Sequence, residues 1–353
     1  MKRPIPAYVD EMIEGAVSRL NNIKNDNTVS FAFITDIHNC IDYTERAMYA
    51  AKKINKQFPL AFCCLGGDYL CNNSSTTKAC AVAQHKEMRA SLENLGNVPP
   101  TMIIKGNHDD NSFGDLKNVI SDRELHGLLF EHNKIFIGDK EAPNAAYGYY
   151  DIPKEKLRAI YLDSMDITYE TDEHGIVTGM NPISLSFGNR QLNWFATEAL
   201  KLPHKDWSVV ILSHTMPIAT PLMYDRPFGG EALWEILCAF KRGGSYKAKA
   251  EKNGAFYDIA CDFSYQGAGD VIAFITGHEH ADRTQKIDGI RVITAAAAAS
   301  DTFGSGMCDN GRIQYKTRGS GEESAFTIFT ADRKMRRIWA IRCGAGDDYS
   351  IDY

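Results

Sequence analysis

Hydrophobic and polar positions follow a regular order of helices and strands along the first third of the chain. Apolar residues recur at helical spacing between positions 9 and 23, which predicts an amphipathic helix ending at the polar turn 24–27. Three apolar strands then alternate with two helical stretches. The predicted strands cover 29–36, 60–68 and 101–109, and the predicted helices cover 43–57 and 76–95. Because these strands are almost continuously apolar, they are typical of a sheet that is buried on both faces.

The pattern in the rest of the chain predicts further strands and two more helices. The strands are predicted at 146–152, 156–164, 207–217 and 270–280, and the helices at 188–200 and 231–241. Four more strands follow between residues 283 and 343, and we predict that they form a second sheet. No internal repeat or linker divides the chain. The sequence therefore predicts a single domain, 1–353, with an insertion around 218–265 that shapes a substrate pocket.

Composition and charge exclude some classes of protein. Of the 353 residues, 44% are hydrophobic and 24% are charged, as in ordinary soluble globular proteins. The formal net charge of −6 argues against a dedicated nucleic-acid-binding protein, because neutralising phosphates requires a basic face. The basic stretch 241–252 is interpreted as a solvated run of charge rather than as a phosphate-contacting loop.

The first residues and the cysteines indicate a cytoplasmic protein. Residues 1–15 contain no apolar run of the secretory type, and no segment is long and apolar enough to suggest a membrane span. The nine cysteines are odd in number and include no C-x-x-C pair, which argues against a disulfide framework and against a zinc knuckle. We interpret them as reduced, mostly buried thiols. No pattern indicates an oligomeric state.

Five predicted strands end in polar residues that are suited to binding a ligand. In an open α/β sheet the carboxyl ends of neighbouring strands meet at one edge, and ligands bind there. Five of the ten histidines in the chain lie at these ends. The polar clusters are Asp36-x-His38, Gly67-Asp68, Gly106-Asn107-His108-Asp109, His214 and Gly277-His278-x-His280.

Each cluster also has an ordinary structural interpretation when it is considered alone. A D-x-H triplet is common by chance, and a single histidine such as His214 is more often hydrogen-bonded in a core than bound to a metal. Asp68 after two glycines is typical of a turn or of a helix N-cap. The alternating histidines at 278 and 280 are more specific, because side chains two residues apart on an extended chain face the same way. It is the conjunction of all five clusters that favours a metal site.

The combined donor set favours transition metals. Two aspartates, one asparagine and four histidines offer mixed oxygen and nitrogen ligands, which suit Mn, Fe, Zn or Co rather than Ca or a thiolate-bound zinc. Seven ligands are enough for two ions if one carboxylate bridges them, and a two-metal centre can clamp the attacking and leaving oxygens of a phosphoryl displacement. The candidate ligands are Asp36, His38, Asp68, Asn107, His214, His278 and His280.

The order of the five clusters resembles the calcineurin-like metallophosphoesterases. The motifs D-x-H, G-D, G-N-H-D, H and G-H-x-H occur in that order between residues 36 and 280. The resemblance implies an α/β fold, a four-layer αββα sandwich in which helices flank two mixed β-sheets. It also implies a metal-dependent phosphoric ester hydrolase, a phosphodiesterase or a phosphatase, that acts on a small phosphoester with two divalent or trivalent transition metal ions.

The resemblance further implies a role for each residue of the clusters. His108 would not be a ligand but would face the substrate, where it could protonate the leaving alkoxide or stabilise the phosphoryl oxygens. Asp109 would orient that imidazole and raise its pKa. The nucleophile would be a metal-bound hydroxide. One ion would be held by Asp36, His38 and His280 and the second by Asn107, His214 and His278, with Asp68 as the bridge.

Two departures from the family leave the substrate open. Asp68 is followed by Tyr-Leu-Cys rather than by the x-x-Asp-Arg-Gly of the protein Ser/Thr phosphatases, and Cys71 stands where the purple acid phosphatases place a tyrosine ligand. Two alternative functions also stay open. One is a nuclease of the same fold, and the other is a non-catalytic metal-binding scaffold, for which we would expect His108 or a ligand to have been lost.

Overall fold

The computed structural model of the chain contains two compact units. One unit consists of residues 1–71, 82–103 and 275–353, and the other consists of residues 72–81 and 104–274. The structure describes the following residues: 4–73, 75–95, 99–112, 116–166, 169–173, 177–179, 185–219, 226–252, 254–299 and 316–353.

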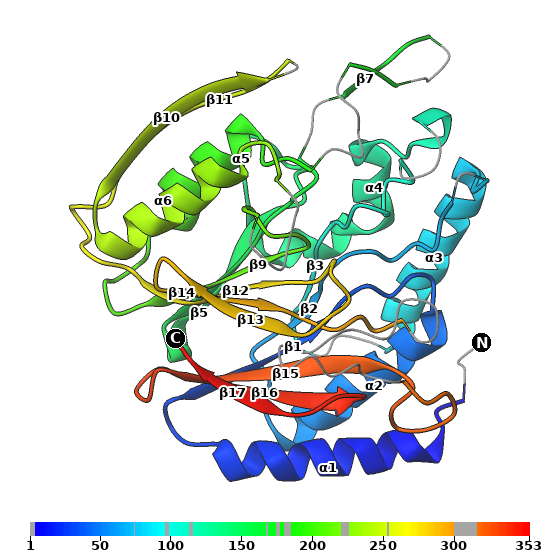
Figure 1. The fold of residues 1–353 in the computed structure, drawn as a ribbon. Helices are drawn as coiled ribbons and strands as arrows, with labels where there is room; N and C mark the ends of the chain where they lie inside the picture. The colour runs from blue at the N-terminus through cyan, green and yellow to red at the C-terminus, as the bar shows by residue number, and fades with distance from the viewer. Residues whose placement is uncertain are drawn as a thin grey trace. The chain divides into compact units, whose positions relative to one another are not determined.

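The first unit is built on a six-stranded mixed sheet (Figure 1). The strand order is β17-β16-β15-β1-β2-β3, with β1, β2 and β3 parallel to one another and the other neighbours antiparallel. The strands are β1 (Thr28–Ile34), β2 (Cys63–Leu65), β3 (Thr101–Ile103), β15 (Ala325–Asp332), β16 (Arg337–Gly344) and β17 (Tyr349–Asp352). The helices are α1 (Ala7–Ile23), α2 (Ile41–Gln57) and α3 (Lys78–Leu95), whose first residues, 78–81, belong to the second unit.

Helix α1 follows directly from the apolar spacing in the sequence. Val9, Ile13, Ala16 and Leu20 recur every three or four residues, and all of them are buried. The helix begins after Pro6, where the fixed φ of proline does not interrupt a helical hydrogen bond. With its apolar face covered, α1 packs against α2 and β16 (Figure 1).

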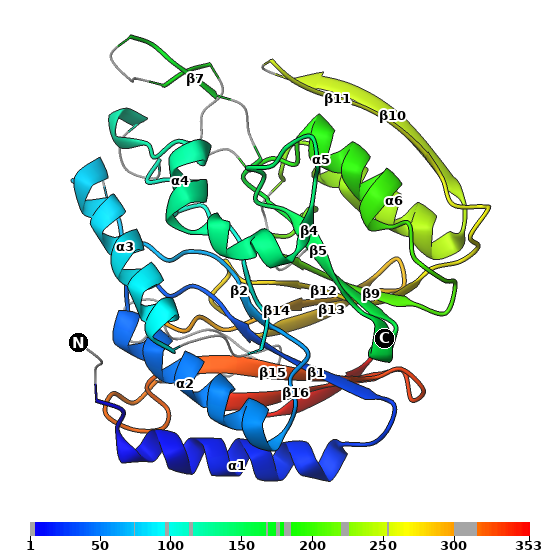
Figure 2. The ribbon, with the colours of Figure 1, turned by 180° about the vertical axis from the view of Figure 1, so that it is seen from behind.

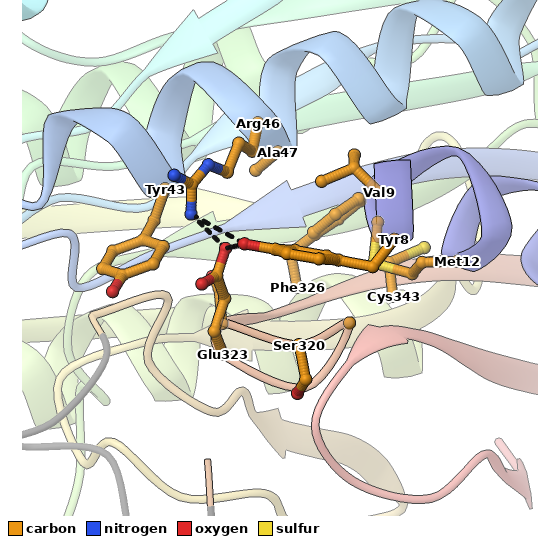
Figure 3. A pocket seen from close by; sticks show the side chains of 12 residues that line it. Tyr8, Val9, Met12, Tyr43, Arg46, Ala47, Ser320, Glu323, Phe326 and Cys343 are labelled. Atoms are coloured by element: carbon orange, nitrogen blue, oxygen red, sulfur yellow. Dashed lines mark hydrogen bonds and ion pairs between the residues drawn. The ribbon is translucent and has the colours of Figure 1, made fainter. Parts of the chain in front are cut away.

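A hydrogen-bonded triad ties α1 and α2 to the segment that precedes β15 (Figure 3). The Tyr8 hydroxyl donates to Glu323 Oε1 at 2.6 Å, and the Arg46 guanidinium donates both to the same carboxylate oxygen and to the Tyr8 hydroxyl. Burial and the Glu323 carboxylate raise the pKa of Tyr8 to about 12. The pocket around this triad has a volume of about 20 Å³, which is room for one water molecule, so we interpret it as a structural tie.

The second unit contains most of the second sheet. Its strands lie in the order β12-β9-β6-β5-β4, with β6 and β9 parallel and β4, β5 and β6 antiparallel. Their bounds are β4 (Ile137–Gly138), β5 (Gly148–Ile152), β6 (Leu157–Tyr161), β9 (Ser208–Ser213) and β12 (Asp270–Thr276). The last two residues of β12 belong to the first unit, where β14 (Ile290–Thr294) and β13 (Arg283–Ile287) extend the sheet to seven strands.

The remaining elements of the second unit are three α-helices, three 3₁₀ turns and two short hairpins among the described residues. A hairpin of β10 and β11 runs along α5 and α6 (Figure 2). The helices are α4 (Asp122–Leu128), α5 (Asn189–Trp194), which continues as a π-helical turn (Phe195–Ala199), and α6 (Gly230–Arg242). The other elements are the 3₁₀ turns Leu116–Asn118, Phe130–Ile135 and Pro153–Glu155, and the strands β7 (Tyr169–Thr171), β8 (Val177–Gly179), β10 (Ser245–Lys252) and β11 (Ala255–Asp262).

The predicted mixed α/β fold with two large mixed sheets is confirmed, but part of the predicted strand pairing is wrong. The sequence assigned all four C-terminal strands to a second sheet, whereas β15 and β16 join β1 in the first sheet. The physical reason is that β1 has an open antiparallel edge, and that Phe329 of β15 pairs there with Phe31 in a fully buried position.

The prediction of a single domain with a substrate-shaping insertion stays a prediction. The described part of the segment 218–265 forms α6 and the β10–β11 hairpin, and residues 220–225 and 253 lie outside the described residues. The eight described cysteines are free thiols, and four of them are buried, whereas the sequence predicted that most of the cysteines would be buried. None of the described helices is long and apolar enough to cross a membrane.

Candidate metal centre

The turns that follow β1, β2 and β12 carry five of the predicted ligands, all of them in the first unit. Each of these five residues has a positive φ, a conformation that costs a non-glycine residue about 1–2 kcal/mol. The φ angles are 55° for Asp36, 46° for His38, 58° for Asp68, 69° for His278 and 54° for His280. Such strain persists only where the surroundings hold the backbone in place, and it is typical of functional sites.

Backbone hydrogen bonds hold the first two of these turns together. The amide of Asp36 donates to Gly67 O at 3.0 Å, and the amide of His38 donates to Asp68 O at 2.9 Å. The parallel strands β1 and β2 bring their carboxyl ends side by side, so the turns continue the pairing of the strands.

Gly277 allows the third turn to approach the first. A Cβ atom at this position would lie 2.0 Å from Thr35 Oγ1 and 2.5 Å from Asp36 Oδ2, and neither distance is compatible with a side chain. The space is needed because the backbone N–H of His278 donates to both carboxylate oxygens of Asp36 at 3.1 Å. The glycine of the G-H-x-H motif therefore has a steric explanation in this fold.

Four side chains of the first unit converge on one point. His38 Nε2 lies 3.1 Å from His280 Nε2, and His280 Nε2 lies 3.3 Å from Asp36 Oδ1. Asp68 Oδ2 lies 3.9 Å from His38 Nε2. One ligand atom from each of these four residues lies within 4.8 Å of the other three, and only His280 is not fully buried.

This arrangement fits a metal ion. Metal–nitrogen bonds are about 2.0–2.1 Å long, so two ligands of one ion are about 3.0 Å apart at a right angle and about 3.4 Å apart at the tetrahedral angle. The distances of 3.1 and 3.3 Å fall in this range. Buried carboxylates and imidazoles this close together also need a cation to offset their desolvation.

The ring of His38 is set up as a ligand. Its Nδ1–H donates to Leu70 O at 3.1 Å, which leaves the lone pair of Nε2 directed at the other ligand atoms. Burial lowers the pKa of His38, although Asp68 and Asp36 oppose the shift. A lowered pKa favours the neutral imidazole, which is the form that binds metals.

The second unit supplies the other two predicted ligands. Asn107 Oδ1 lies 3.0 Å from His214 Nε2, and both residues are buried. His214 directly follows β9, whose residues are all buried, so the backbone that carries the imidazole ring is held in place. An amide oxygen and an imidazole nitrogen at this separation are again compatible with neighbouring positions on one ion.

The imidazole of His108 has a partner that the sequence did not indicate. His108 Nδ1 lies 2.6 Å from the side-chain oxygen of Asn72, and the Asn72 amide nitrogen donates to His108 O at 3.1 Å and to Asn111 Oδ1 at 3.0 Å. Asn72 belongs to no recognisable motif. Its position four residues after Asp68 carries no signal without knowledge of the turn that brings it to His108.

Asp109 has a clear role in the backbone of the G-N-H-D turn. Its Oδ2 accepts the N–H of Gly106 at 2.7 Å, and its own N–H donates to Gly106 O at 3.2 Å. These bonds fix the turn from which Asn107 and His108 project. The predicted contact of Asp109 with the His108 ring stays a prediction.

Comparison with known proteins gives a family and a fold. The sequence model of the calcineurin-like phosphoesterases matches residues 29–282, while no curated protein matches the chain in sequence. A dimetal phosphatase from Danio rerio is similar in structure, with a TM-score of 0.59 at 14% identity over 92% of this chain and 99% of that one. GAP50, the anchor in the inner membrane complex of Plasmodium, has a TM-score of 0.46 at 10% identity over 92% and 89% of the two chains.

The family match covers more than half of the chain and includes every one of the five polar clusters. The geometry of the first unit agrees with it, because four residues of these clusters meet in a group suited to a metal ion. The chain belongs to the calcineurin-like phosphoesterase family and is a metal-dependent phosphoric ester hydrolase.

Proposed function

We propose that the protein is a dinuclear metallophosphoesterase that hydrolyses a small phosphodiester or phosphomonoester. The observation that carries the proposal is the convergence of Asp36, His38, Asp68 and His280 around a point with the spacing of metal ligands. A group of this kind within a calcineurin-like phosphoesterase supports a catalytic rather than a scaffolding role, because His108 and all seven predicted ligands are present.

The proposed ligand assignment follows the clusters. Asp36, His38 and His280 hold one ion, and their mutual distances support this part of the assignment. The second ion is assigned to His278 with Asn107 and His214, and the short distance between the latter two supports their pairing. Asp68 is the proposed bridge. The mixed nitrogen and oxygen donors suit Mn, Fe, Zn or Co.

The protein side chains then have defined tasks. When bound, the two ions provide Lewis acidity and lower the pKa of coordinated water towards about 7. The ligands would hold the ions in fixed positions, and the buried surroundings of Asp36 and Asp68 strengthen each electrostatic contact there. We assign to His108 the transfer of a proton to the leaving oxygen through Nε2, because Nδ1 is engaged by Asn72.

A nuclease is the weaker alternative. Of the basic stretch 241–252, the residues Ser245–Lys252 form β10, where Lys247 and Lys249 are exposed, and Lys249 Nζ lies 3.7 Å from Asp258 of the paired strand. The positive charge of Lys249 is therefore offset by a carboxylate of the neighbouring strand. Together with the net charge of −6, this supports a small substrate over a nucleic acid.

Hydrolysis of two model substrates side by side tests the proposed function. The protein is stripped with chelator, reloaded with Mn²⁺, and assayed on bis-p-nitrophenyl phosphate and p-nitrophenyl phosphate. We expect turnover that returns with metal and is lost in Asp68→Asn, since the amide cannot bridge two cations as a carboxylate can. The ratio of diester to monoester turnover assigns the substrate class. A fully loaded protein that hydrolyses neither ester would contradict the proposal.

A further inference from the structure

An ion pair deep in the first unit lies two residues beyond the ligand His280. The guanidinium of Arg342, on β16, donates from Nη2 to Oδ2 of Asp282, and the two residues are only 2% and 5% exposed. Among the described residues, Nε and Nη1 of Arg342 have no hydrogen-bond partner, so Asp282 is the acceptor that offsets the buried charge. The pair takes no part in the proposed chemistry.

Asp282 also connects the G-H-x-H turn to the chain after β14. Its Oδ1 accepts the N–H of Ala296 at 3.1 Å. One residue earlier, Ala281 O accepts the hydroxyl of Thr294 at 2.8 Å. The end of the turn that carries His278 and His280 is therefore fastened to residues 294–296.

The chain that continues from residue 296 is also hydrogen-bonded to the D-x-H turn. The amides of Ala298 and Ala299 donate to Thr35 O and Asp36 O at 2.8 and 2.9 Å. From the other side, the Ser324 hydroxyl donates to Ala298 O at 2.8 Å, and the Lys316 amine donates to Ala299 O. Residues 294–299 thus form a strut between two ligand turns, and small side chains allow the strut to pack this closely.

We propose that Arg342 and Asp282 are positioning residues that hold His280 and Asp36 at the mutual distance a metal ion requires. The ion pair fixes Asp282, which holds the strut through Ala296, and the strut holds the backbone of Asp36. Both ligand turns have strained backbones, with positive φ at Asp36 and His280, and they need external restraint to keep this geometry. The inference rests on the proposed metal binding of these residues.

Cobalt binding tests the inference without relying on catalysis. The metal-stripped wild type is titrated with Co²⁺ alone. Calorimetry measures the binding, and the visible absorption bands of the bound Co²⁺ report its coordination geometry. The variant Asp282→Asn/Arg342→Met removes both charges but keeps an oxygen for the Ala296 N–H. The matched control is Asp151→Asn/Arg158→Met, which makes the same substitutions in a partly buried pair of 2.6 Å whose described contacts include no predicted ligand. Urea unfolding of each protein records global stability.

We expect the Asp282→Asn/Arg342→Met variant to bind one of its Co²⁺ ions about 10–100-fold more weakly and to show shifted bands, as is usual when a residue supporting a metal ligand is changed. The control variant Asp151→Asn/Arg158→Met should differ from the wild type in its urea midpoint but not in its Co²⁺ absorption spectrum. If the double variant does not fold, Asp282→Asn alone is measured in the same way. A folded variant with band positions and affinity like the wild type would overturn the inference. Wild-type protein that binds no Co²⁺ would instead overturn the proposed function on which it rests.

Discussion

The side-chain oxygen of Asn72 lies 2.6 Å from Nδ1 of His108. The orientation of the amide is fixed, because its nitrogen already donates to His108 O and to Asn111 Oδ1. The oxygen must therefore face the ring, and Nδ1 carries the hydrogen that it accepts. This leaves Nε2 as the atom available to a substrate. A carboxamide in this place orients the imidazole without adding the negative charge that a carboxylate would.

Substitutions of Asn72 should separate orientation from charge. Asn72→Leu removes the acceptor, and we expect kcat to fall by about tenfold or more with little change in KM, since the ring is no longer held in its productive orientation. Asn72→Asp keeps an acceptor oxygen and should retain most of the turnover. Steady-state kinetics on a phosphodiester checks both variants. Equal kcat values for the wild type and Asn72→Leu would show that the contact has no part in catalysis.

Replacing His108 should affect the leaving group more than the metals. In His108→Ala, turnover of an ester with a poor leaving group such as an alkyl alcohol should fall by about 10²–10⁴-fold, because no acid protonates the departing oxygen. Turnover of a p-nitrophenyl ester should fall less, since p-nitrophenolate leaves without a proton. Metal content, measured by elemental analysis, should be unchanged. A uniform loss across leaving groups would contradict the assigned role.

Gly277 should tolerate no side chain. In Gly277→Ala the Cβ would overlap Thr35 Oγ1 and Asp36 Oδ2, so the turn must shift and the bond from His278 N–H to Asp36 must lengthen. We expect a loss of stability of about 1–3 kcal/mol, as for overpacking elsewhere in proteins, and weaker metal binding. Urea unfolding and metal titration measure the two effects. Gly127→Ala in α4, where a Cβ meets no atom within 4 Å, is the control: it should leave metal binding unchanged and, because alanine is the better helix former, raise stability by up to about 1 kcal/mol.

A buried carboxylate in the second unit should make stability depend on pH. Burial raises the pKa of Asp163 to about 7, with Asp166 adding to the shift and Lys105 opposing it. The folded state then binds more protons than the unfolded state between about pH 4 and 7, so the stability falls as the pH rises through this window.

The variant Asp163→Asn has no proton to lose and keeps an acceptor for the Met165 N–H. The stability of the variant relative to the wild type should be greater at pH 8 than at pH 5 by at most about 3 kcal/mol, because only the roughly two pH units between pH 5 and the folded pKa contribute, at about 1.4 kcal/mol each. Urea unfolding of both proteins at the two pH values gives the difference. A stability difference between the variant and the wild type that is the same at both pH values would disprove this assignment.

Local features of the sequence are enough to propose the ligands, because each candidate lies within a few residues of the end of an apolar strand and no distant partner is needed to recognise it. Asp36, Asp68 and His214 lie one to three residues beyond the ends of β1, β2 and β9, which are shorter than the pattern predicted. Partners from distant parts of the chain could not be predicted in this way. Asn72, Asp282 and the pairing of β15 with β1 depend on contacts across many residues, which no periodicity encodes.

The backbone conformation of the turns that carry the ligands could not be predicted from the sequence either. Propensity does not predict a positive φ at Asp36 or His280, and the hydrogen bonds that restrain these turns, including those around residues 294–299, join distant parts of the chain. The acidic C-terminal residues Tyr349–Asp352, whose sequence indicates no function, form the edge strand β17 beside β16. Local rules fail here because tertiary contacts override them.

The most direct measurement of the central claim is a titration of metal-stripped protein with Mn²⁺ during hydrolysis of bis-p-nitrophenyl phosphate. A dinuclear enzyme should be inactive without metal, gain turnover as metal is added, and reach a plateau at two equivalents per chain. Chelator should abolish this turnover, and Asp68→Asn should not show it at any metal concentration. Full turnover at one equivalent, or turnover in the metal-free protein, would contradict the account.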